Sequence, residues 1–220
     1  MMSPSSPVLA SHASGRALFA VVTTLLVATL LAACTISRPY AVKRMFLLEP
    51  TAPATASGTP KPASVRVGIV NIAAPFRGKT FTYRESDLRY ESDFYDEFFI
   101  APAIMFSDAT AKALAASNVF RRVVPFGAAS DEGDYVLDGF VSELYADTRD
   151  PAAPAAVITV TYYLTPMNVV TPGVVWTREY RQRAKVLGAG PEAVARGWNE
   201  ALTGVLAELT RDLAAAELPK

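Results

Sequence analysis

The residues best suited to chemistry in this 220-residue chain are four acids close together, Glu91, Asp93, Asp96 and Glu97. Paired carboxylates can act as the general acid and base of glycoside hydrolysis. The same acids alternate with aromatic residues, which is also the pattern of solvated charges around a packed ring cluster. Both interpretations stay open. Only the first predicts a hydrolase activity that is lost when Glu91 and Asp96 are replaced.

Aromatic residues crowd the same stretch, residues 81–99, and offer a binding surface as an alternative to a packed core. Aromatic side chains are enriched at protein interfaces, so the surface would contact lipid or a partner protein. The candidate residues for this surface are Tyr83, Arg84, Tyr90, Phe94, Tyr95 and Phe98. A basic run at residues 178–185 is a second candidate, for an anionic head group or an acidic partner. Exposed cations of this kind also discourage pairing at the edge of a sheet.

Histidine and cysteine are nearly absent, and this limits the catalysis open to the chain. The single histidine is His12 and the single cysteine is Cys34. If the N-terminal segment is removed and Cys34 is modified, a Ser-His-Asp triad, a Cys-His pair, a zinc site of the usual ligands and a disulfide are all excluded. We therefore expect no catalytic residue, no metal and no cofactor, and we expect that the protein is not an enzyme.

Cys34 follows a segment typical of a secretory signal peptide. Arg16 is the only charged residue before it, an apolar run spans residues 17–31, and small residues precede the cysteine. A positive end, a short apolar core and a small-residue cleavage site are the parts of such a peptide. The alternative, an uncleaved membrane anchor, needs about 20 predominantly apolar residues, and this run is shorter.

The residues around the cysteine indicate a lipid anchor. Leu31, Ala32, Ala33 and Cys34 resemble the bacterial lipobox, which implies cleavage after residue 33 and acyl chains, such as palmitate, on Cys34. Thr35 in place of Asp favours the outer membrane, facing the periplasm. Cleavage would leave 187 of the 220 residues and would remove Arg16 alone among the 21 cations, so 20 cations face 21 acids and the net charge is −1. This charge argues against a nucleic-acid partner.

The rest of the chain predicts an α+β domain. Alternating or continuous apolar residues predict strands over residues 40–48, 65–72, 80–84, 88–91, 119–125, 134–145, 156–165 and 174–186. Pro102 and Pro191 mark the starts of helices that reach about residues 118 and 218. We expect a mixed, largely antiparallel sheet with a three-strand meander and two helices packed on one face. Residues 34–64 would hold the lipidated N-terminus, the first strand and a Pro/Ala-rich linker, and residues 65–220 the domain.

The order of several motifs resembles the ABC-type transport auxiliary lipoproteins, the PqiC-like lipoproteins of MCE-type (mammalian-cell-entry) lipid transport systems. The resemblance lies in Tyr83-Arg84, the aromatic stretch from Tyr90 to Phe98, the helix proline Pro102, and the exit Leu114 to Phe120. Phe98 and Phe99 stand where the family often has Trp, and Phe46 replaces an opening Tyr.

The resemblance implies a non-enzymatic periplasmic subunit that holds the outer-membrane end of a bridge for phospholipid or other hydrophobic molecules. It implies an MCE-type substrate-binding protein, an inner-membrane permease and an ATPase as partners. Some members of the family form homo-oligomeric rings, so the resemblance also allows a homo-oligomer. The family defines no catalytic residue. Similar small lipoproteins activate cell-wall synthases, so a regulator of such a synthase remains the alternative function.

Overall fold

The computed structural model describes residues 22–23, 42–55, 58–128, 133–167, 169–170 and 173–219. The chain divides into two units, residues 1–41 and 42–220. All of the strands in the described part belong to the second unit. The lipobox residues 31–34 lie outside the described residues, so lipidation of Cys34 stays a prediction from the sequence.

Three long strands form the predicted meander, which is confirmed. β6 (Tyr135–Asp147) pairs antiparallel with β7 (Ala155–Pro166), and β7 pairs antiparallel with β8 (Trp176–Lys185). Apolar residues alternate along β7, and Ile158, Val160, Tyr162 and Leu164 are fully buried. Among the described residues β8 pairs with β7 alone and forms one edge of the sheet.

The other side of β6 pairs with two strands in succession. The first half of β6 pairs parallel with β2 (Lys61–Ile72), and its last two residues pair parallel with β3 (Thr80–Arg84). The short 3₁₀ helix η2 (Ala74–Phe76) connects β2 to β3. Beyond β2 lies β5 (Phe120–Val124), parallel to it; beyond β3 lie β4 (Tyr90–Phe98), antiparallel to β3, and β1 (Arg44–Phe46), parallel to β4.

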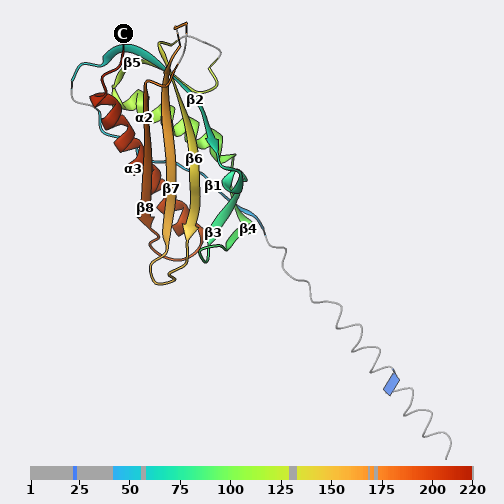
Figure 1. Cartoon of the computed structure of the whole chain (residues 1–220). Helices are drawn as coiled ribbons and strands as arrows, with labels where there is room; N and C mark the ends of the chain where they lie inside the picture. Colours follow the sequence, from blue (N-terminus) through green and yellow to red (C-terminus); the bar gives the residue numbers. More distant parts are fainter. Residues whose placement is uncertain are drawn as a thin grey trace, which may run out of the picture. The chain divides into compact units, whose positions relative to one another are not determined.

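Two helices cover one face of this sheet (Figure 1). α2 (Pro102–Ser117) packs on β2 and β5, and α3 (Pro191–Ala215) packs on β7 and β8. Each begins at the predicted proline, and α2 ends at the left-handed Asn118, with φ of 57°. The predicted apolar stripe of α3 is entirely buried: Val194, Trp198, Leu202, Val205, Leu209 and Leu213. The predicted α+β class, with a mixed sheet and both helices on one face, is confirmed.

The predicted linker, residues 49–64, differs from expectation at both ends. Residues 49–55, which we call the strap, contact the two helices: Glu49 N–H donates to Asn199 Oδ1 at 2.5 Å, Thr51 N–H donates to Thr203 Oγ1 at 3.0 Å, and Thr55 Oγ1 donates to the Ala116 carbonyl at 3.4 Å. At the other end, β2 begins at Lys61, four residues before the predicted start. The helices therefore carry a partial third layer that proline-rich composition alone does not predict.

A bulge in β2 depends on α2 for its stability. The register of β2 against β6 shifts between Val67 and Val70. The displaced Val70 N–H donates instead to Ser107 Oγ of α2 at 2.9 Å, and the Ser107 hydroxyl donates to the Ala103 carbonyl at 2.8 Å. A Cβ at position 68 would lie 1.9 Å from a carboxylate oxygen of Asp138, so any larger residue there would require the Asp138 side chain to move.

Candidate interaction surface

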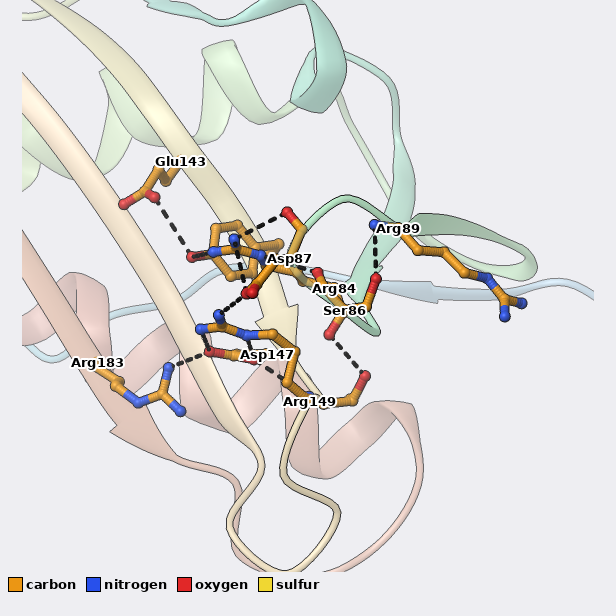
Figure 2. A network of polar contacts seen from close by, with 10 residues as sticks. Arg84, Ser86, Asp87, Arg89, Glu143, Asp147, Arg149 and Arg183 are labelled. Atoms are coloured by element: carbon orange, nitrogen blue, oxygen red, sulfur yellow. Dashed lines mark hydrogen bonds and ion pairs between the residues drawn. The ribbon is translucent and has the colours of Figure 1, made fainter.

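The turn between β3 and β4, residues 85–89, is organised by Arg84 (Figure 2). Its guanidinium donates to the carbonyls of Ser86 and Asp87, at 3.3 and 3.2 Å, and to Tyr145 Oη at 3.3 Å. The same group lies over the rings of Tyr90 and Tyr145, at 5.5 and 5.7 Å from their centroids. Such cation–π contacts stabilise a partly buried arginine. Arg84 therefore holds the turn in place and presents little of itself to a partner, because its side chain is only 19% exposed.

A buried carboxylate joins this turn to the meander. Asp147, 2% exposed, accepts hydrogen bonds from Arg149 Nε and Nη2 at 2.9 and 2.8 Å and from Arg183 Nη1 at 2.5 Å. These bonds, led by those from Arg149, hold the pKa of Asp147 well below its usual range. Arg149 also donates to Asp87 Oδ1 of the turn at 2.7 Å. Figure 2 shows the resulting chain of charges from Asp87 to Arg183 on β8.

Strand β4 contains a large bulge, residues 93–96. Thr80 pairs with Glu97 whereas Thr82 pairs with Ser92, so the residues between them leave the ladder. Asp93 Oδ1 closes the bulge by accepting the N–H groups of Tyr95 and Asp96, at 2.7 and 3.0 Å. Bulges re-aim side chains, and this one directs Phe94 and Tyr95 into solvent. Their rings pack edge to face, with centroids 5.1 Å apart.

An ion pair fixes the bulge to β1. Arg44 Nε and Nη2 donate to the two oxygens of Asp96, at 2.7 and 2.9 Å. Asp96 is 3% exposed, and burial raises its pKa while Arg44 acts in the opposite direction. A bidentate arginine–carboxylate pair has a defined geometry, so the aromatic pair at residues 94–95 projects from a fixed backbone.

Three of the six predicted surface residues are well exposed. Phe94 is 71% exposed, and Tyr90 and Tyr95 are each 44% exposed. Tyr83 is half-buried and packs against the core, and burial, with Asp93 and Asp96 nearby, raises its pKa to about 12. Tyr83 therefore belongs partly to the core, and Arg84 lies against Tyr90.

The placement of Phe98 on the surface is wrong. Phe98 is 1% exposed, and its ring lies 4.9 Å from Phe81 and 5.3 Å from Trp198, measured between centroids. The cause is strand alternation, which turns position 98 inward and leaves Phe99 outside, 55% exposed. The sequence offered two adjacent phenylalanines, and the bulge before them decides which one enters the core.

Further apolar residues that we did not predict lie on the same outward face. In β1 and just after it, Met45 and Leu47 are 52% and 44% exposed. Since Met45 pairs with Glu97, alternation places residues 45 and 47 on the side of residues 95, 97 and 99. We call this the β1–β4 outer surface, made by Met45, Leu47, Phe94, Tyr95 and Phe99. The apolar residues at positions 45, 47, 95 and 99 would have predicted most of this surface if the parallel pairing of β1 with β4 had been known.

The acids proposed as a catalytic pair are engaged separately. Asp96 is buried against Arg44, whereas Glu91 is exposed and pairs with Arg89 at 3.5 Å. This arrangement gives no support to a shared general acid and base. Within the described ranges, no group of three or more His, Cys, Asp or Glu side chains is arranged to hold a metal ion. Among the helices that the structure describes, none is both long enough and apolar enough to cross a membrane.

The basic run of β8 is largely occupied by ion pairs within the domain. Arg178 pairs with Asp212 at 3.3 Å, Arg181 with Glu143 at 3.4 Å, and Arg183 with the buried Asp147. These pairs fit the interpretation as a charged outer strand better than an anion site.

Comparison with known proteins identifies the fold. No family model matches the chain, and no curated protein matches it. Among solved structures it is similar to protein XCC0632 from Xanthomonas campestris, a member of the family DUF330, with a TM-score of 0.67 and 18% identity over 76% of this chain and 92% of that one. An uncharacterized protein is similar with a TM-score of 0.57 and 14% identity over 79% of this chain and 97% of that one. At these identities the likeness establishes a shared fold.

Proposed function

We propose that the chain is a lipid-anchored periplasmic auxiliary subunit of an ABC-type, MCE-linked system that transports lipid or other hydrophobic molecules, and that it acts by tethering and docking. The observation that carries the proposal is the lipobox-like Leu31 to Cys34, placed eight residues before the first described residue of the α+β domain, Val42. The membrane would be the outer one, with the domain facing the periplasm, as Thr35 indicates.

The positions of the motif residues support a docking subunit. Arg84 supports a turn, Tyr83 packs against the core, and Pro102 starts α2. The Leu114-to-Phe120 exit ends α2 in a left-handed turn, with Ser117 Oγ donating to the Leu114 carbonyl at 2.8 Å. Each of these residues shapes the fold rather than a pocket for a reacting group. The shared fold with the DUF330 protein adds support at the level of architecture.

Acylation of Cys34 would hold the domain at the membrane essentially permanently. Burial of acyl chains contributes about 0.8 kcal/mol per CH₂, and a single chain anchors only marginally. The two or three chains of a bacterial lipoprotein exceed that threshold, so the protein would act from a fixed place. Its partners would be an MCE-type substrate-binding protein with its permease and ATPase.

The anchor is tested by replacing Cys34 with Ala. We expect the wild-type protein to incorporate labelled palmitate and to sediment with the outer membrane, and Cys34→Ala to lose both properties while its domain stays folded by circular dichroism. Ser37→Ala, three residues away, serves as a matched control that keeps the label. A Cys34→Ala protein that stays in the membrane fraction would show that residues 17–31 are a transmembrane anchor instead.

The partner is tested by crosslinking in cells that express the wild-type protein. We expect recovery of the MCE-type component, and we expect deletion of the gene to impair detergent resistance and outer-membrane lipid asymmetry. Recovery of cell-wall synthases alone, together with altered peptidoglycan crosslinking, would contradict the transport role and support the regulatory alternative.

A further inference from the structure

We infer that the β1–β4 outer surface rests on the lipid headgroup layer beside the anchor and so fixes the orientation of the domain on the membrane. This inference depends on the proposed acylation of Cys34. It adds a second, non-covalent membrane contact, made by folded protein, to the acyl chains.

The chemistry of the surface suits the boundary between headgroups and acyl chains. Phe94, Phe99 and Met45 are each more than half exposed, and Leu47 and Tyr95 are 44% exposed. Clustered exposed apolar residues of this size mark protein or membrane contacts. Tyrosine favours the membrane interface because its ring is apolar and its hydroxyl is polar.

The length of chain between the anchor and the domain confines this surface to the neighbourhood of the membrane. Val42 lies eight residues after Cys34, and β1 begins at Arg44. Eight residues span at most about 28 Å when fully extended. The strand tied most closely to the bilayer is therefore the one that carries Met45, and β4 lies directly beside it. This connection favours lipid over a distant partner as the occupant.

The charges around the surface are already satisfied within the domain. Glu97 pairs with Lys43 Nζ at 3.1 Å, Asp96 with Arg44, and Asp93 with two backbone N–H groups. Lys43 also lies over the Phe94 ring, 5.5 Å from its centroid, and remains 44% exposed. Because each of the three carboxylates has a partner, contact with headgroups need not remove water from an unpaired carboxylate. The exposed part of the Lys43 side chain would contact a lipid phosphate if this surface rests on the headgroups.

The test relies on Cys34 being the single cysteine of the chain. In the acylated protein Cys34 is blocked, so a cysteine introduced by Tyr95→Cys is the only reactive thiol. The variant is labelled with the fluorophore NBD and reconstituted into vesicles of phosphatidylethanolamine and phosphatidylglycerol. Phe140→Cys is the matched control, because Phe140 is 40% exposed and lies on β6, away from the β1–β4 pair. Phe99→Cys replaces Tyr95→Cys if that variant fails to fold.

We expect NBD at position 95 to shift to shorter emission wavelength, to brighten several-fold, and to be quenched by lipids that carry a nitroxide near the headgroup, while NBD at position 140 stays unchanged. Flotation of the vesicles is scored separately on the wild-type protein. Loss of flotation, or NBD labelling of the wild-type protein, would overturn the proposed anchor and the inference with it. Normal flotation with equal, water-like NBD signals at positions 95 and 140 would overturn the inference alone. An NBD signal at position 95 that changes only after the MCE-type protein is added would do the same.

Discussion

The assignment of Phe98 to the core and Phe99 to the surface can be tested with two single substitutions. Burial of a phenylalanine side chain contributes about 2–3 kcal/mol, and its contacts with the Phe81 and Trp198 rings add about 1 kcal/mol. Phe98→Ala should therefore lower the free energy of unfolding by about 3–4 kcal/mol, inside the range known for such truncations. Phe99→Ala, at an exposed position, should change it by less than about 0.5 kcal/mol.

The assay is urea unfolding of residues 35–220, followed by tryptophan fluorescence. With an m-value of about 2.5 kcal/mol per molar urea, Phe98→Ala should lower the midpoint by about 1.4 M and Phe99→Ala by less than about 0.2 M. Equal m-values in the two variants would show that only stability has changed. Similar midpoints for both variants, or a larger loss for Phe99→Ala, would refute the alternation that separates core from outer surface at these residues.

Two further substitutions test the buried polar contacts. Asp147→Asn should cost about 2 kcal/mol at neutral pH, less than the 3–5 kcal/mol of a fully buried pair because Arg149 and Arg183 are partly exposed. The pKa of Asp147 in the folded protein lies below its unfolded value of about 4. The contribution of the ionised carboxylate to the free energy of unfolding is therefore complete above about pH 4 and is lost as the pH falls through the folded pKa. The difference between the wild-type and Asp147→Asn urea midpoints should be constant from about pH 5 to 7 and should narrow below about pH 4. Ser107→Ala should cost about 1–3 kcal/mol because it leaves the Val70 N–H buried without an acceptor. Ser117→Ala, whose hydroxyl bonds within its own helix, should cost less in the same urea assay, and equal losses would contradict the role of Ser107 in the β2 bulge.

Elements governed by local sequence were predictable. Pro102 and Pro191 suit the first turn of a helix whatever surrounds them, and an apolar stripe such as that of α3 has one stable orientation against a sheet. The three strands of the meander carry their own alternation and short connections. The class of the fold followed from these elements.

Features that depend on tertiary partners were not predictable. Strict alternation along residues 134–145 puts Leu144 on the face away from Leu137, but β6 shifts register between Val141 and Glu143, and both leucines are buried in one core. The shift turns Tyr145 toward Arg84 on the opposite face. The β4 bulge has the same effect on Phe98 and Phe99. An odd number of residues added to a strand turns every later side chain to the other face of the sheet, and β4 gains three relative to β3 between Ser92 and Glu97. The groups that accept the hydrogen bonds of a bulge belong to neighbouring parts of the folded protein.

The candidate surface was therefore predicted in part. Phe94, Tyr95 and Tyr90 follow from aromatic composition, whereas Met45 and Leu47 require the parallel pairing of β1 with β4, two strands about fifty residues apart in the sequence. The ion-pair chain from Asp87 to Arg183 gave no signal in the sequence, because its members come from β6, from β8 and from two different turns.

The strap lies next after β1 on the path along which tension on the proposed anchor would travel through the chain. If Cys34 is acylated as proposed, tension on the anchor would reach the described part of the domain at Val42 and would load β1 first, where three residue pairings and the Arg44–Asp96 pair resist it. If β1 detaches, the load passes next to Glu49 and Thr51, which are bonded to Asn199 and Thr203 in the long helix α3. On this path the chain from Val42 to Leu48 would extend before the central sheet carries load, and the hydrogen bonds of the strap would be the next contacts to resist the tension.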